Sequence, residues 1–73
     1  MDALVKNRVS FELTTAKKYL NKTLFLFENN DDCIKVIKSS RKAQGALGNA
    51  RKIMLEALNG NQEFNKIIQL LRN

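Results

Sequence analysis

The sequence predicts an all-α fold, a long antiparallel helix hairpin followed by a short C-terminal helix. Proline, which breaks helices, is absent from the 73 residues. Apolar residues recur every three or four positions, which is the period of a helix. The pattern is interrupted at two clusters rich in Asn or Gly, ENNDD at 28 to 32 and NGN at 59 to 61. These clusters divide one all-helical domain, residues 1 to 73, into helices expected at about 3 to 28, 31 to 58 and 61 to 72.

The first predicted helix carries one apolar stripe at steps of three and four residues. The stripe is made by Val5, Val9, Leu13, Ala16, Leu20, Leu24 and Phe27. Phe11, Tyr19 and Leu26 fall outside it. We therefore expect a second apolar contact surface on the same helix.

The second predicted helix begins after Asp31 and Asp32, because carboxylates accept hydrogen bonds from the free N–H groups at a helix start. A seven-residue apolar repeat follows over about three heptads. Its positions are Cys33, Val36 with Ile37, Ser40, Ala43, Leu47, Ala50, Met54 and Ala57 with Leu58. Asn59 and Gly60 predict the end of the helix.

Two glycines, Gly45 and Gly48, lie in the middle of this second helix. Each costs about 0.5 to 1 kcal/mol relative to Ala inside a helix. This cost favours a close approach between helix backbones, and the alternative is a tolerated glycine or a kink.

Asn61 predicts the start of the third helix, with an apolar stripe of Phe64, Ile67, Ile68 and Leu71. A helix of this length is marginal by itself, so we expect it to dock on another helix.

Length and composition limit both the stability and the chemistry of the chain. A domain of this size buries only roughly 60% of its unfolded surface, and such small proteins usually add a disulfide, a metal or a partner. The chain has no His and one Cys, which excludes an internal disulfide, a His-ligated metal and a His-based catalytic triad. Self-association remains, so we expect a homodimer or a higher oligomer without cofactor or metal.

Catalytic groups are equally scarce. Asp31 and Asp32 are explained by helix capping, and Gly45 and Gly48 interrupt a helix and do not form a phosphate-binding loop. We expect no enzymatic activity.

The N-terminal segment MDALVKNRVSF carries charges where a signal peptide needs an apolar stretch. No apolar run approaches the ~20 residues of a membrane span, and an unpaired Cys is typical of a reducing compartment. These features predict a cytoplasmic protein with no membrane partner.

The net charge of +6, from 13 Lys or Arg against 7 Asp or Glu, points to a polyanionic partner. An antiparallel hairpin brings the second half of the first helix beside the start of the second, and most cations lie there. Those expected to contact phosphates are Lys17, Lys18, Lys22, Lys38, Arg41 and Lys42. Without a recognition-helix signature or a base-stacking motif, contacts would be with phosphates and groove shape. DNA is the favoured partner, RNA the second, and a plain solvated face the alternative.

Cys33 is a candidate thiol sensor. The helix start and nearby lysines favour a reactive thiolate, whereas Asp31 and Asp32 beside it oppose one. Because Cys33 begins the apolar repeat, a small buried side chain is the favoured interpretation.

Residues 26 to 58, LFENNDDCIKVIKSSRKAQGALGNARKIMLEAL, resemble the core of the copper-, nickel- and formaldehyde-sensing bacterial repressors. A short acidic turn precedes Cys33, and Val36 and Ile37 match the apolar pair of the family. The small-residue segment and the helix end match at Ala43, Gly45, Ala46, Leu47, Asn49, Leu55 and Glu56. The resemblance implies an all-helical DNA-binding repressor whose dimer has a four-helix core with the cysteine at the subunit boundary.

The chain departs from this family at two places. It has Leu58 and Gln62 where the family has metal-ligating His, and LTTAKKYLNK in place of an Arg-x-x-Gly-Gln signature. One thiolate does not complete a Cu(I), Ni(II) or Co(II) site, so no metal is implied.

The sequence therefore predicts a small DNA-binding transcriptional repressor that has lost metal sensing or responds through Cys33 alone. The alternative is a helical structural or adaptor module whose exposed Phe11, Phe25 and Phe64 dock a protein partner.

Overall fold

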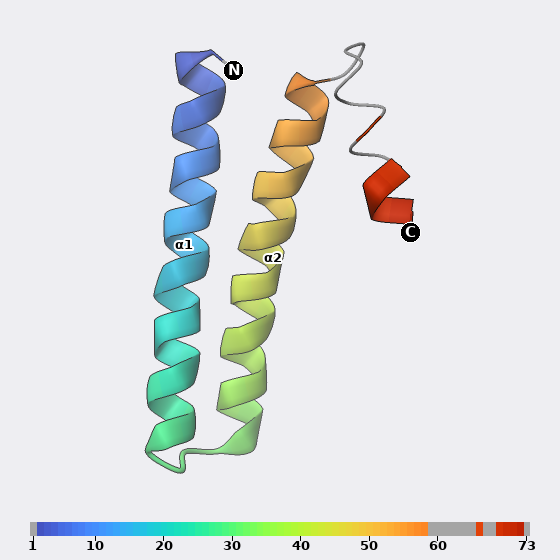
Figure 1. The fold of residues 1–73 in the computed structure, drawn as a ribbon. Coiled ribbons are helices and arrows are strands. Elements are labelled where there is room, and N and C mark those ends of the chain that lie inside the picture. The colour runs from blue at the N-terminus through green and yellow to red at the C-terminus, as the bar shows by residue number, and fades with distance from the viewer. Residues whose placement is uncertain (1, 59–65, 67–68, 73) are drawn as a thin grey trace.

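Two long antiparallel helices make up most of the computed structural model, which describes residues 2–58, 66 and 69–72 (Figure 1). Helix α1 spans Ala3–Glu28 and helix α2 spans Cys33–Ala57. The predicted hairpin is confirmed. Helix α1 has its predicted bounds, whereas α2 begins two residues later and ends one residue earlier than the predicted range of 31 to 58.

Most of the predicted third helix at 61 to 72 lies outside the described residues, including its proposed cap Asn61 and most of its stripe. The Asn59 and Gly60 stop signal lies outside them too. Residues 69 to 72 are helical and exposed to solvent. Within the part of the chain that the structure describes, no helix combines the length and apolar character needed to cross a bilayer.

An aspartate caps the start of each long helix. The carboxylate of Asp2 accepts from the N–H of Val5 at 2.9 Å, and that of Asp32 accepts from the N–H of Ile34 at 2.9 Å. Asn30, in the turn between the helices, has a φ of 55°, a left-handed conformation that Asn adopts more readily than most residues. The capping role predicted for the acidic turn is confirmed for Asp32.

The two helices meet along a seam of small side chains. On α2 the buried residues are Ser39, Ala43, Ala46 and Ala50, at steps of four, three and four. On α1, Val9 and Ala16 are buried. Among the described residues, therefore, no buried apolar side chain is larger than valine. Such small side chains let two helices lie close together but contribute little buried area.

One polar cluster crosses the seam near the turn. Ser39 is only 3% exposed. Its hydroxyl donates to the carbonyl oxygen of Tyr19 at 3.1 Å and lies 2.9 Å from Oγ1 of Thr23, which is itself 2.7 Å from the same carbonyl. Because a buried hydroxyl is costly without a partner, these bonds fix the position of one helix against the other.

The predicted apolar stripes are wider than this seam. Leu13, Leu20, Leu24 and Phe27 of α1 are 44 to 69% exposed, and Ile37 and Leu47 of α2 are each 48% exposed. On α2 the seam runs through Ser39 and Ala46, one position before the predicted Ser40 and Leu47. The seam is thus formed by the small side chains of each stripe, such as Ala16 and Ala43. The large side chains, such as Leu20 and Leu47, lie to one side of it.

The predicted close approach at Gly45 and Gly48 is wrong for the single chain. A Cβ atom at either position would meet no neighbouring atom within 4 Å. The buried alanines of α2 lie on the side of the helix that faces α1, and the glycines do not.

The hairpin forms a single layer, since α1 and α2 lie side by side along their length (Figure 1).

We expect Ala46→Leu to lower the free energy of unfolding by about 1 to 3 kcal/mol, because a larger side chain overpacks the seam. Urea denaturation followed by circular dichroism measures the change. The matched control is Ala57→Leu, the same substitution at an exposed position of α2. Equal effects of both substitutions would contradict the seam.

We expect Gly45→Ala and Gly48→Ala each to raise the free energy of unfolding by about 0.5 to 1 kcal/mol, since a methyl group meets open space and restricts the unfolded chain. The same denaturation experiment measures this gain. A decrease in stability would instead reveal a close contact made by these glycines in an assembly.

Candidate nucleic-acid interface

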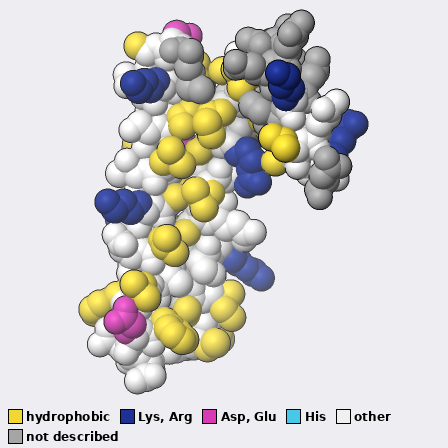
Figure 2. Space-filling view, viewed as in Figure 1, with side chains coloured by type: hydrophobic (Ala, Val, Ile, Leu, Met, Phe, Trp, Pro, Cys, Tyr) yellow, Lys and Arg dark blue, Asp and Glu magenta, His cyan; other side chains and the backbone are white. Residues whose placement is uncertain are grey.

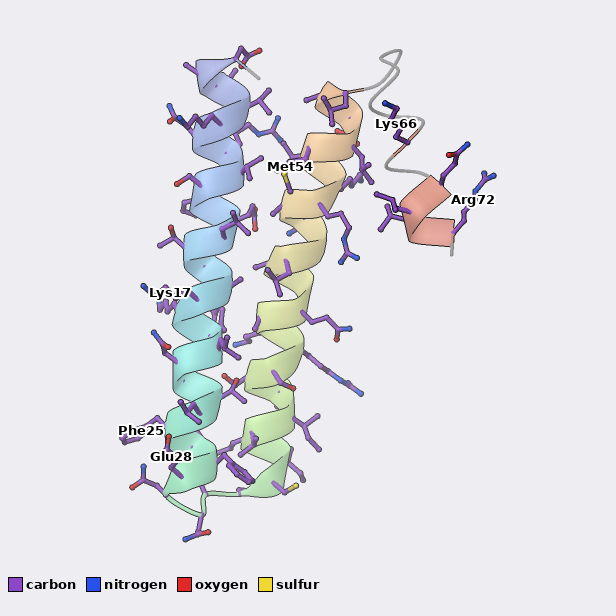
Figure 3. The ribbon with its side chains drawn as sticks, viewed as in Figure 1. Lys17, Phe25, Glu28, Met54, Lys66 and Arg72 are labelled. Carbon is purple, nitrogen blue, oxygen red and sulfur yellow. The ribbon has the colours of Figure 1, made fainter. Side chains whose placement is uncertain are left out.

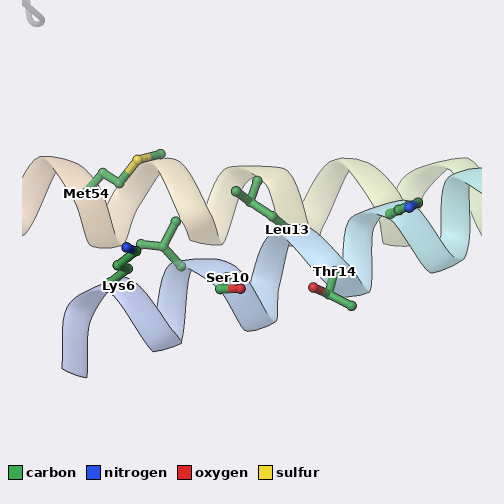
Figure 4. Close-up of a pocket in the computed structure, with 7 residues that line it drawn as sticks. Lys6, Ser10, Leu13, Thr14 and Met54 are labelled. Atoms are coloured by element: carbon green, nitrogen blue, oxygen red, sulfur yellow. The ribbon is translucent and has the colours of Figure 1, made fainter. Parts of the chain in front are cut away.

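One broad face of the layer is apolar. Leu13, Leu20 and Leu47 border a groove whose floor includes Ala16 and Ala43. Figure 2 shows hydrophobic side chains gathered in a band down this face, with Lys and Arg at its edges. A second groove continues from Leu13 toward the open end of the hairpin and reaches Met54 of α2 (Figure 4). We call Leu13, Leu20, Leu47 and Met54 the apolar face.

The opposite face of the layer carries a basic groove near the turn. Its lining includes Lys22 from α1 and Lys35, Lys38 and Lys42 from α2, with Leu26 and Ser39 completing it. We call these four lysines the lysine groove. Residues nine apart on a helix project about 180° from each other. Lys22 is nine residues from Leu13, and Lys38 is nine residues from Leu47, so the lysine groove and the apolar face point in opposite directions.

Tyr19 extends this basic cluster to one more lysine. Its ring lies 5.4 Å from Nζ of Lys42 and 5.9 Å from Nζ of Lys18, which are cation–π distances. The backbone carbonyl of Tyr19 accepts the hydrogen bond from Ser39 at 3.1 Å, so the polar cluster of the seam also positions this ring.

Few acids neutralise the cluster. Among the residues that the structure describes, the ion pair present joins Nζ of Lys35 to Oδ1 of Asp31 at 3.6 Å. Within the same residues, Lys18, Lys22, Lys38 and Lys42 have no carboxylate oxygen within 4 Å. Like charges held close together without counter-charges create a positive potential that attracts anions.

Four of the six lysines and arginines predicted to contact phosphates come together here: Lys18, Lys22, Lys38 and Lys42. The structure separates the other two from them. Lys17 lines the grooves of the apolar face and points away from α2 (Figure 3). Arg41 is exposed and lies one position before Lys42, so it projects about 100° away from it.

Lys35 joins the groove although it was not among the predicted site residues. Its signal is visible in the sequence, because Lys35, Lys38 and Lys42 follow at steps of three and four and so share one side of a helix.

Cys33 is exposed, so the favoured expectation of a buried side chain is wrong for the single chain. The physical reason is its place before the seam, whose first partly buried residue on α2 is Val36. Across the described parts of the chain, no three His, Cys, Asp or Glu side chains come together in a way that could hold a metal ion.

Comparison of the chain with known protein families, curated proteins and solved structures finds no match. The function must therefore be inferred from the geometry of the two faces and from the residues that form them.

We expect the thiol of Cys33 to react with a disulfide reagent such as Ellman's reagent in the folded protein, at a rate close to that of a free thiol, because the side chain is exposed. Absorbance of the released thiolate measures the rate, with Cys33→Ser as the blank. Reaction only after addition of urea would contradict this exposure.

Proposed function

We propose that this protein is a small DNA-binding regulator that holds the phosphate backbone of duplex DNA in its lysine groove. The observation that carries the proposal is the convergence of five lysines from both helices, Lys18, Lys22, Lys35, Lys38 and Lys42, with one carboxylate in contact among the described residues. Each lysine that neutralises a phosphate releases condensed counterions, which favours binding at low salt.

Duplex DNA suits the groove better than a single strand does. Proteins that bind single strands stack bases on exposed aromatic rings. Here the lining of the groove consists of lysines, a serine and a leucine, with no aromatic side chain among them. Lysines act as flexible point charges, so they position the protein on the backbone without reading the sequence of bases.

The proposal extends the resemblance of residues 26 to 58 to the metal- and formaldehyde-sensing repressors. We propose transcriptional repression in the cytoplasm by a dimer, or a higher oligomer, with a four-helix core. Because the chain lacks the His ligands of that family, the regulator works without a metal site.

A second candidate function is that of an adaptor that docks a protein partner. It is supported by Phe11, which is 68% exposed and borders a separate groove with Arg8 and Ile53. Phe25 is also 66% exposed, while Phe64 lies outside the described residues. Direct DNA binding by the purified protein separates the two candidates.

We expect the triple variant Lys22→Ala, Lys38→Ala, Lys42→Ala to bind a labelled duplex at least tenfold more weakly than the native protein at low salt. Titrations at about 50 mM and about 200 mM salt should also show the salt slope falling by about 2.7, which is about 0.9 for each phosphate that is no longer neutralised. Fluorescence anisotropy measures both quantities.

The matched control for this variant removes the same charge elsewhere, through Lys17→Ala, Arg41→Ala and Lys52→Ala, and should change the slope by less than about one. If both variants bound the duplex equally weakly, the loss would be explained by the lower net charge and not by the lysine groove. A native protein that binds no duplex at low salt, or that prefers single-stranded RNA, would refute the proposed function.

A further inference from the structure

A single layer of two helices lacks the second layer that a folded domain needs. Domains are built from at least two layers that bury apolar side chains between them. In this chain α1 and α2 form one layer, and among the described residues the buried apolar side chains stop at the size of valine. The larger side chains of the predicted stripes must therefore find their burial outside the hairpin.

The side chains of the apolar face remain to be covered. Leu13, Leu20 and Leu47 are 44 to 61% exposed and line one groove on the same side of the layer. A second copy of the chain offers the same apolar side chains in return, and standard interfaces bury roughly 800 Å² per partner.

The apolar face has the pattern of half a four-helix core. Leu13 and Leu20 are seven residues apart on α1, and Leu47 and Met54 are seven residues apart on α2, so each pair projects in one direction. Leu20 is 61% exposed and Leu47 is 48% exposed. A second copy related by a two-fold axis brings the same four side chains to face them, which is how antiparallel hairpins complete a bundle.

Packing of the apolar faces leaves both lysine grooves on the outside. The lysine groove lies about half a helix turn away from the apolar face on both helices, as the nine-residue separations of Lys22 from Leu13 and Lys38 from Leu47 require. In a dimer of two layers, the two lysine grooves therefore point in opposite directions. One straight duplex can contact only one of them.

From this geometry we infer that the protein dimerises through the apolar face and bridges two separate segments of duplex DNA, one in each outward lysine groove. This inference rests on the proposed function, because it needs the groove to bind phosphates. The added activity is the bridging of two duplexes, which phosphate binding by a single groove does not provide.

The test uses two duplexes, one fixed on beads through biotin and one free and fluorescent. The full chain should capture the free duplex on the beads, with a maximum at intermediate protein concentration, because excess protein saturates each duplex with its own dimers. Light scattering gives the mass of the protein alone, and anisotropy gives the binding to a single duplex.

Leu20→Glu removes the apolar contact, and we expect it to yield a monomer and to lower the capture at least tenfold. Phe25→Glu is the matched control, because Phe25 is 66% exposed, points away from α2 (Figure 3) and projects about 140° from Leu20 on α1. It should leave both the dimer and the capture unchanged. Circular dichroism shows whether each variant remains helical.

The outcomes separate this inference from the proposed function. Absence of duplex binding by the native protein refutes both, whereas binding by a dimer without capture of the second duplex refutes the bridging alone. A native protein that is monomeric at the assay concentration also refutes it, as does a helical Leu20→Glu variant that still captures DNA. If Leu20→Glu does not fold, the bridging is tested on the native protein and on Phe25→Glu. Both must be dimers in light scattering and must capture the second duplex.

Discussion

The seam of small side chains between α1 and α2 determines most of what this molecule can do. Ala16 on one helix faces a side of the other that carries Ala43, Ala46 and Ala50. Alanines let two helices approach closely, but they fill little volume, so the leucines of both helices remain beside the seam. A hairpin built in this way is well defined in its pairing yet poor in buried apolar area. Its remaining stability must come from what covers those leucines.

The same seam organises the charged side of the layer. Ser39 belongs to the seam and also lines the lysine groove. Through its hydrogen bond to the carbonyl of Tyr19, it connects the packing of the helices to the ring on which Lys18 and Lys42 lie. Local repulsion between like charges is offset by the attraction of both cations to the ring.

Short-range sequence features predicted correctly where the two long helices lie in the chain. They predicted poorly which side of each helix faces the other helix. The missing proline and the aspartate before α2 specify where helices run and start, because capping and backbone geometry act over a few residues. Periodicity marks which residues are apolar but not which neighbour they face. It therefore grouped Leu47 with Ala43 and Ala50 in one stripe, although Ala46 is the residue buried between them. A shift of one position turns a helix by about 100°, which is why Lys17 and Arg41 were grouped with residues of the groove.

The opposite placement of the two faces gives the chain an unusual freedom to vary. Here Leu20 and Lys22 are two residues apart in sequence yet project about 200° apart on α1. In the proposed DNA-binding dimer, a substitution on one face would therefore change the strength of assembly without changing the strength of DNA binding, and a substitution on the other face would do the reverse.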